Sequence, residues 1–184
     1  YSYVDYAMGH NPDNRMPLWI KPAKKVTVKN VADVMRDHYE GTPMDMTTDI
    51  GAGGNALPYR WRPMDFEYEG KKYTNERAIA TQQTGFWFVG QARGNYPDVI
   101  GGILWFGTDD AATSYVTPIY SNTEKVPECF RQGNGNLLSY SATSSFWINN
   151  RISNACYRMY NIMAPYVRER IDKFENEQME KVRQ

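Results

Sequence analysis

Four short β-prone segments in the middle of the chain constrain its fold more than any other feature. They cover residues 73–83, 84–92, 100–107 and 113–120, and each is followed or preceded by turn-forming residues. The connection at 94–98, GNYPD, is of the kind that joins antiparallel strands. The pattern predicts a four-stranded antiparallel meander.

Apolar residues within this expected meander fall on alternate positions. Phe86 and Phe88 do so in the second segment, and Ile103 and Trp105 do so in the third. Side chains at alternate positions of a strand point to the same face of the sheet. We therefore expect one heavily apolar face that is covered by other elements, and an aromatic core there rather than a substrate wall.

A helix is expected over residues 27–41, before the strands. Thr27 has the side chain of a helix cap, and Gly41 with Pro43 ends the pattern. The apolar positions recur at helical spacing and comprise Val31, Val34, Met35 and His38. We interpret His38 as extending this stripe in a packing or capping role, with a functional role as the alternative.

A longer helical region is expected over residues 144–182, after a polar surface excursion at 121–143. Ser144 or Ser145 is the expected cap, and Pro165 should kink or split the helix because proline lacks a backbone donor. The apolar stripe comprises Ile152, Cys156, Met159, Met163 and Tyr166. With a loop-rich first segment at 1–26, the chain reads as one α+β domain over residues 1–184.

The charge composition narrows the possible partners. Lysine and arginine residues number 21, and aspartate and glutamate residues also number 21. No net field therefore attracts nucleic acid or an anionic membrane surface, and no apolar run approaches the roughly 18 residues of a membrane span. We expect a small-molecule or protein partner, with no nucleic acid and no membrane.

The chain has few residues suited to metal binding or disulfide formation. Cys129 and Cys156 are too few for a disulfide framework and lack zinc-ligand spacing. His10 and His38 are far apart and have no glutamate at ligand spacing on a common helix face. We expect no metal and no cofactor.

Local motifs identify no catalytic constellation. No serine stands in a G-x-S-x-G context, and the chain has only two histidines. The glycine-rich segment 49–62 matches neither the P-loop nor the dinucleotide-binding spacing, so a turn that allows close backbone approach is the simpler interpretation. The residues alone define an α+β domain without an assigned reaction.

Seven strings in fixed order nevertheless resemble one family. They are PLWIKP at 17–22, MRDHYEGTP at 35–43, DMTTDIGAG at 45–53, PYRWRP at 58–63, NERAIATQQTGFWFVGQAR at 75–93, IGGILWFGTDDA at 100–111 and VTPIY at 116–120. Together they are similar to the dipeptidase A family of cysteine peptidases, within the N-terminal-nucleophile (Ntn) hydrolase superfamily. After residue 121 mainly the long helices correspond.

The resemblance implies a fold and a mechanism. The superfamily fold is an αββα sandwich, of which an antiparallel meander flanked by helices would be one part. An N-terminal cysteine attacks the peptide carbonyl while its own α-amine, with an ordinary pKa of about 7.7–8.0, serves as the base. The first residue here is Tyr1, so we expect the nucleophile in an upstream portion of the same polypeptide. This chain alone is then inactive.

The resemblance also implies a dipeptide substrate, and the sequence offers residues that would contact it. In the expected strand 73–83, polar residues at odd-numbered positions share one face. They are Asn75, Arg77, Thr81 and Gln83. Arg77 would bind the substrate carboxylate in a bidentate pair, or form a structural salt bridge. Asp109 and Asp110 would receive the substrate α-ammonium, or stabilise a turn.

Two other functions stay open at this point. One is a related amide acylase of the same superfamily, and the other is a non-catalytic, aromatic-rich binding module. The binding module predicts a domain with no missing sheet partners, whereas a hydrolase portion predicts open strand edges. A homo-oligomer is a further possibility. The compartment is undetermined, with a secreted or periplasmic location slightly favoured over a cytoplasmic one.

Overall fold

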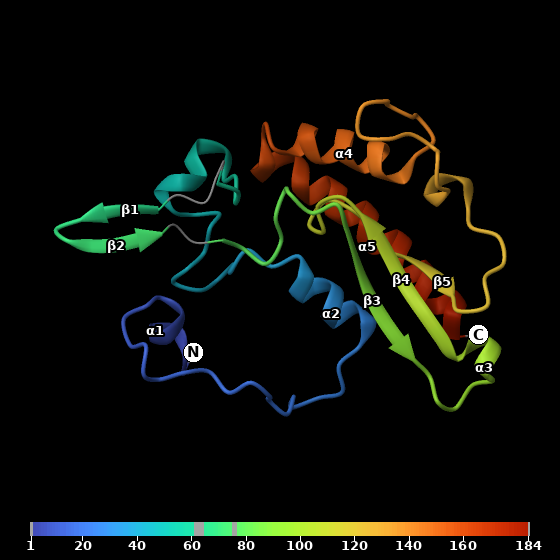
Figure 1. The fold of residues 1–184 in the computed structure, drawn as a ribbon, viewed down its shortest axis with the longest axis horizontal. Coiled ribbons are helices and arrows are strands. Elements are labelled where there is room, and N and C mark those ends of the chain that lie inside the picture. The colour runs from blue at the N-terminus through green and yellow to red at the C-terminus, as the bar shows by residue number, and fades with distance from the viewer. Residues whose placement is uncertain (1, 61–64, 75–76, 184) are drawn as a thin grey trace.

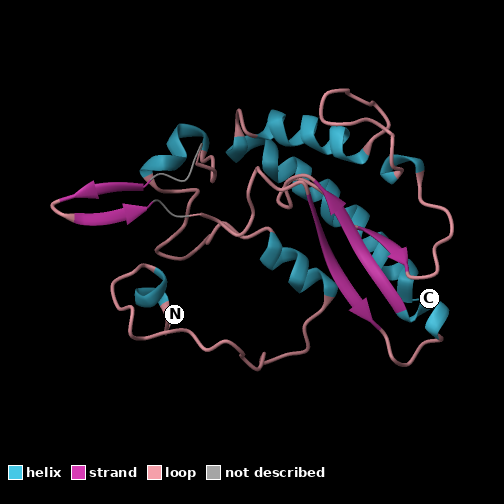
Figure 2. Ribbon diagram, viewed as in Figure 1, coloured by secondary structure: helices cyan, strands magenta, loops and turns pink. Residues whose placement is uncertain are grey.

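The computed structural model describes residues 2–60, 65–74 and 77–183, in a mixed helical and antiparallel arrangement of the α+β class. Long loops precede α2 and separate β5 from α4 (Figure 2). In chain order the elements are α1 (Val4–Ala7), α2 (Val28–Met35), η1 (Ile50–Asn55), β1 (Asp65–Tyr68), β2 (Lys71–Thr74), β3 (Phe86–Ala92), α3 (Asp98–Gly101), β4 (Gly102–Thr108), β5 (Thr117–Tyr120), η2 (Glu128–Phe130), α4 (Ser145–Cys156) and α5 (Tyr160–Arg183).

The central sheet contains three antiparallel strands in the order β3-β4-β5. This confirms the meander for the second to fourth expected segments. Helices α2, α4 and α5 lie beside the sheet and contact β3, β4 and β5 respectively (Figure 1). None of the helices in the described ranges is long and apolar enough to cross a membrane.

The first expected strand, over residues 73–83, is wrong for most of its length. Residues 73–74 belong to β2, which pairs with β1 in a separate hairpin, and residues 77–83 form no strand. The backbone there bonds to loops instead. The Ala80 amide donates to the Asp37 carbonyl at 3.2 Å, and the Thr84 amide donates to the Thr81 carbonyl at 3.2 Å.

One face of the sheet is apolar and covered, as predicted, but the placement of Phe86 and Phe88 on that face is wrong. The register pairs Val89 with Trp105 and Phe88 with Phe106. Val89 and Trp105 therefore lie on the covered face, whereas Phe86 and Phe88 lie on the opposite face with exposed fractions of 62% and 52%. Alternation within one strand does not reveal whether the odd- or the even-numbered residues of the next strand lie on the same face of the sheet. The pairing register decides that.

The helices are interrupted earlier than the sequence predicts. Thr27 does cap α2, and its hydroxyl accepts from the Asn30 amide at 3.2 Å. The helix ends at Met35, however, and Arg36 already adopts a non-helical conformation. The later helical region breaks between α4 and α5, at residues 157–159, while Pro165 lies inside α5.

A buried ion pair joins the end of α2 to α5. Arg36 and Glu175 have side chains that are 3% and 0% exposed, with an Nη2–Oε1 distance of 2.5 Å. The second guanidinium nitrogen, Nη1, donates to Glu175 Oε2 at 3.1 Å. The Arg36 guanidinium also lies 4.7 Å from the centre of the Trp87 ring. The geometry is bidentate and fully enclosed, as a buried pair requires.

The same pair holds the connection between β4 and β5. Arg36 donates to the carbonyls of Ala111, at 2.8 Å, and Ser114, at 3.0 Å. Glu175 accepts from the Val116 amide at 2.9 Å. These side-chain bonds satisfy backbone groups of the segment that precedes β5, which begins at Thr117.

Replacing Arg36 should strongly destabilise the fold. Arg36→Ala leaves Glu175 buried without a counter-ion, and we expect the free energy of unfolding to fall by about 3–5 kcal/mol. Urea denaturation followed by circular dichroism measures this. Arg168→Ala is the matched control, because Arg168 pairs with Asp33 and Asp172 in a partly exposed position and should cost at most about 1 kcal/mol. Equal losses in the two variants would contradict the assignment.

Candidate functional site

The carboxyl end of β4 carries two adjacent buried aspartates. Asp109 has a positive φ of 69°, and its carboxylate accepts from Ser153 Oγ at 2.6 Å and from Asn150 Nδ2 at 3.2 Å. Asp110 accepts from the Ala112 amide at 2.9 Å and from the Tyr157 hydroxyl at 2.9 Å. Both carboxylates thus have partners within the chain, and burial raises the pKa of Asp109.

A cluster of aromatic and polar side chains lies next to Asp110. The His38 ring is 1% exposed and makes a 2.9 Å hydrogen bond between Nε2 and the Tyr59 hydroxyl. The other ring nitrogen, Nδ1, lies 2.8 Å from Glu40 Oε1. The Tyr59 ring packs edge-on against those of Tyr157, at 5.3 Å, and Tyr160, at 6.1 Å. We call these five residues the His38–Tyr59 cluster.

The electrostatics of the cluster keep its tyrosines neutral. Burial, and then the nearby charge of Asp110, raises the pKa of Tyr59, Tyr157 and Tyr160 above the ordinary tyrosine value. Their hydroxyls are therefore protonated at neutral pH and able to donate hydrogen bonds.

Glu40 shows the opposite behaviour. Burial alone would raise the pKa of Glu40, but hydrogen bonds from the His38 side chain and backbone lower it to about 2. The neighbouring Asp37 has a raised pKa because of burial and a hydrogen bond with Glu40. Glu40 is therefore firmly ionised, whereas the adjacent carboxylate of Asp37 protonates more readily.

An open cavity of about 490 Å³ lies against this cluster. Its lining includes His38, Glu40 and Tyr160, together with Asp37 and Arg168. Its lining residues come mainly from the end of α2, the loop that follows it and the first turns of α5. Its volume suits a small molecule. Its lining combines carboxylates with the guanidinium groups of Arg36 and Arg168, and Tyr160 is the cluster tyrosine that lines it.

The structure brings three of the sequence-predicted site residues together, although not on a strand. Arg77, Thr81 and Gln83 line a small hollow of about 20 Å³ beside Tyr59. Tyr59 also adjoins Asp110, so it links the two groups of candidates. The remaining candidate, Asn75, lies outside the described residues.

Several cluster residues were not predicted as functional. His38 was interpreted as a packing or capping residue, and it is buried and hydrogen-bonded through both ring nitrogens. Tyr59 and Glu40 lie in the strings PYRWRP and MRDHYEGTP, which carried the family resemblance but no chemical role. Tyr157 and Tyr160 lie in the helical region, where no sequence signal distinguishes them from core residues.

Of the two cysteines, Cys156 is poorly placed for attack on a substrate. Cys156 is 0% exposed, and burial raises its thiol pKa, so little thiolate forms near neutral pH. Cys129 is half-buried within η2. Within the described ranges, no group of three or more histidine, cysteine, aspartate or glutamate residues has the arrangement of a metal site.

Comparison with known proteins identifies the family to which this chain belongs. The model of peptidase family C69 matches residues 3–173, and the chain therefore belongs to this family, the dipeptidase A family of cysteine peptidases. No solved structure matches the chain.

Two curated relatives have dipeptidase names. A probable dipeptidase B of Lactococcus lactis subsp. lactis (strain IL1403) is 24% identical over 140 residues, which are 76% of this chain and 25% of the relative. A probable dipeptidase of Latilactobacillus sakei is 24% identical over 131 residues, which are 71% of this chain and 24% of the relative. The chain thus spans about a quarter of the length of these relatives.

The lowered pKa of Glu40 predicts a pH-dependent contribution to stability. Because the folded pKa, about 2, lies below the ordinary 4.5, this contribution is complete above pH 4.5 and is lost as the pH falls toward 2. In Glu40→Gln we expect a smaller decrease in the free energy of unfolding across this range than in the wild type, measured by urea denaturation. Glu124→Gln, at an exposed position, should follow the wild type, and an unchanged profile in Glu40→Gln would refute the prediction.

Proposed function

We propose that this chain is the C-terminal part of a dipeptidase whose N-terminal cysteine nucleophile lies upstream in the same polypeptide. The observation that carries the proposal is the family match over residues 3–173. The dipeptidase names of both relatives and the chain's span of about a quarter of their length support it. The burial of Cys156 supports a nucleophile elsewhere.

The chemistry follows from a nucleophile that carries its own base. A terminal α-amine with an ordinary pKa of about 7.7–8.0 accepts the thiol proton near neutral pH, so no histidine base is needed. The thiolate attacks the peptide carbonyl and releases the amine product, and water then hydrolyses the thioester. In this mechanism His38 is not the base, and its hydrogen bonds to Glu40 and Tyr59 position the side chains of the cluster.

The exposed sheet face supports an Ntn-hydrolase sandwich. Phe86, Phe88 and Leu104 are 62%, 52% and 37% exposed on one side of the three-stranded sheet. Within the described residues, the outer edges of β3 and β5 also have no strand partner. A second sheet from the upstream portion would cover this apolar face. An aromatic-rich binding module, complete in itself, would not leave these edges and this face open.

The substrate contacts are part of the same proposal. Arg77 supplies a cation for the carboxylate end of a dipeptide, with Thr81 and Gln83 beside it. Asn75 completes the proposed set. Asp109 and Asp110 provide negative charge for the α-ammonium end, and their hydrogen bonds to Ser153 and Tyr157 also fix the adjacent cluster.

Dipeptide hydrolysis by the parent polypeptide tests the reaction. We expect the protein with its upstream portion to hydrolyse dipeptides, and the 184-residue chain alone to be inactive. Replacing the processed N-terminal cysteine by alanine should remove activity, because the thiol forms the covalent intermediate. Retained activity in that variant would refute the mechanism. Faster cleavage of acylated amides than of dipeptides would indicate the related amide acylase.

Substitution of Phe88 tests the second sheet. In the isolated chain Phe88→Ser should change the free energy of unfolding by no more than about 0.5 kcal/mol, because the side chain is exposed. In the protein with its upstream portion the same change should cost about 3–5 kcal/mol, because a large apolar side chain would leave a buried position. Denaturant titration of both forms measures the difference.

The matched control lies on the other face of the sheet. Ile103 is 4% exposed, so Ile103→Ala should cost about 2–5 kcal/mol in both forms of the protein. If Phe88→Ser is equally mild in both forms, the face remains open in the parent polypeptide and the sandwich proposal fails.

A further inference from the structure

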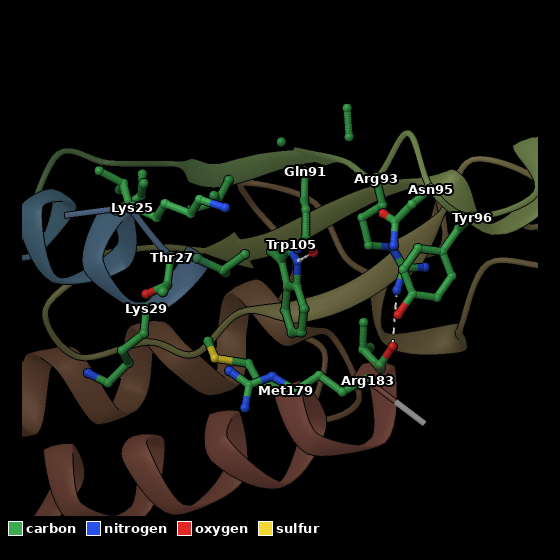
Figure 3. Close-up of a pocket in the computed structure, with 17 residues that line it drawn as sticks. Lys25, Thr27, Lys29, Gln91, Arg93, Asn95, Tyr96, Trp105, Met179 and Arg183 are labelled. Atoms are coloured by element: carbon green, nitrogen blue, oxygen red, sulfur yellow. Dashed lines mark hydrogen bonds between the residues drawn. The ribbon is translucent and has the colours of Figure 1, made fainter. Parts of the chain in front are cut away.

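A second cavity, of about 640 Å³, lies at the free edge of β3 and shares no lining residue with the cavity at the His38–Tyr59 cluster. It is bounded by the start of α2, by β3 and by the last turn of α5 (Figure 3). Its apolar lining includes Val31, Val89, Trp105 and Met179. The cavity therefore offers an apolar body of a ligand a place to bind.

The charged side chains of this cavity all have the same sign. They are Lys25, Lys29, Arg93 and Arg183, and no aspartate or glutamate is among the lining residues. Figure 3 shows the two lysines on the α2 side, Arg93 near Tyr96 at the other end, and Arg183 on α5. This arrangement favours an anion.

Only one of these cations has a carboxylate partner within the described residues. Lys29 pairs with Asp33 at 2.6 Å and with Asp172 at 3.1 Å. Lys25 and Arg183 form no ion pair or side-chain hydrogen bond with the part of the chain that the structure describes. Within the described residues, no carboxylate neutralises these two charges.

Arg93 is held in place without being neutralised. Its Nη1 donates to the Val182 carbonyl at 3.0 Å, its Nη2 donates to the Ile100 carbonyl, and its guanidinium lies 4.1 Å from the centre of the Tyr96 ring. Its Nε is buried and has no hydrogen-bond partner among the described residues. Among the described residues Arg93 therefore contacts only neutral groups, and its positive charge adds to the field of the cavity.

Gln91 adds directed hydrogen-bond donors. Trp105 Nε1 donates to Gln91 Oε1 at 2.9 Å, and this bond fixes the orientation of the amide (Figure 3). The amide nitrogen of Gln91 has no partner among the described residues. It therefore presents N–H groups that can bind an anionic oxygen.

We propose that this cavity binds a small amphipathic carboxylate. The carboxylate lies among Lys25, Arg183 and the Gln91 amide, and the apolar body lies over Trp105 and Met179. An apolar body is part of the proposal because the apolar lining adds affinity only for ligands that bury methylene groups against it. The proposal does not depend on the proposed peptidase reaction, because it is tested by measuring ligand binding and not by measuring hydrolysis.

Calorimetric titration of the 184-residue chain with hexanoate tests the proposal. We expect a dissociation constant between about 0.1 and 10 mM for a ligand of this size. Butanoate, with two fewer methylenes, should bind about tenfold more weakly. Hexanol and inorganic phosphate should each bind at least about tenfold more weakly than hexanoate, because each supplies only one half of the recognition.

Matched charge variants locate the site. Arg183→Ala and Lys25→Ala should each weaken hexanoate binding by about fivefold or more. Lys181→Ala and Lys24→Ala remove the same charge from neighbouring residues outside the cavity lining and should leave the affinity within about twofold. Gln91→Glu places a carboxylate of similar size in the cavity and should also weaken hexanoate binding. This variant tests the site if either alanine variant does not fold.

Three outcomes would overturn the assignment. They are the absence of saturation by hexanoate in the expected range, equal binding of phosphate and hexanoate, and equal effects of the cavity and control variants. Circular dichroism of each variant confirms that the comparison is made between folded proteins. Loss of dipeptidase activity in the parent protein would not bear on this result, because the readout is binding.

Discussion

The Arg36–Glu175 ion pair is the interaction on which the rest of the described structure depends. Two buried charges are costly to remove from water, and they are stable only when each finds a full set of partners. Here the arginine binds the glutamate in bidentate geometry and two carbonyls of the β4–β5 connection, and the glutamate also accepts from the Val116 amide. The pair therefore holds α2, α5 and the sheet in one arrangement.

The candidate site is built directly on this junction. The chain leaves α2 at Arg36 and reaches His38 and Glu40 within four residues, while Tyr160 comes from the first turn of α5. Because the ion pair fixes these two elements relative to each other, the His38–Tyr59 cluster forms next to Asp110. The cluster is thus a product of tertiary packing, and its neutral tyrosines and ionised glutamate follow from burial and hydrogen bonding there.

Charge in this protein is balanced in total but differs between its two cavities. The cavity at the cluster is lined by carboxylates together with Arg36 and Arg168, whereas the cavity at the β3 edge is lined by lysine and arginine residues without any carboxylate. Equal totals of 21 acidic and 21 basic residues do not reveal this difference. The net charge of the chain limits its long-range attraction to polyanions. The charges that line each cavity determine which small molecules bind there.

The sequence by itself determined the α+β class, the order of β3, β4 and β5, the Thr27 cap and, through its ordered strings, the peptidase family. These features depend on local periodicity, turn chemistry or extended similarity, which neighbouring residues encode. Tertiary structure alone decided that Phe88 faces away from Trp105, because strand register sets that. It also decided that residues 77–83 bond to loops rather than to a strand. The same holds for the pairing of Arg36 with Glu175, since no local pattern specifies a contact between residues 139 positions apart.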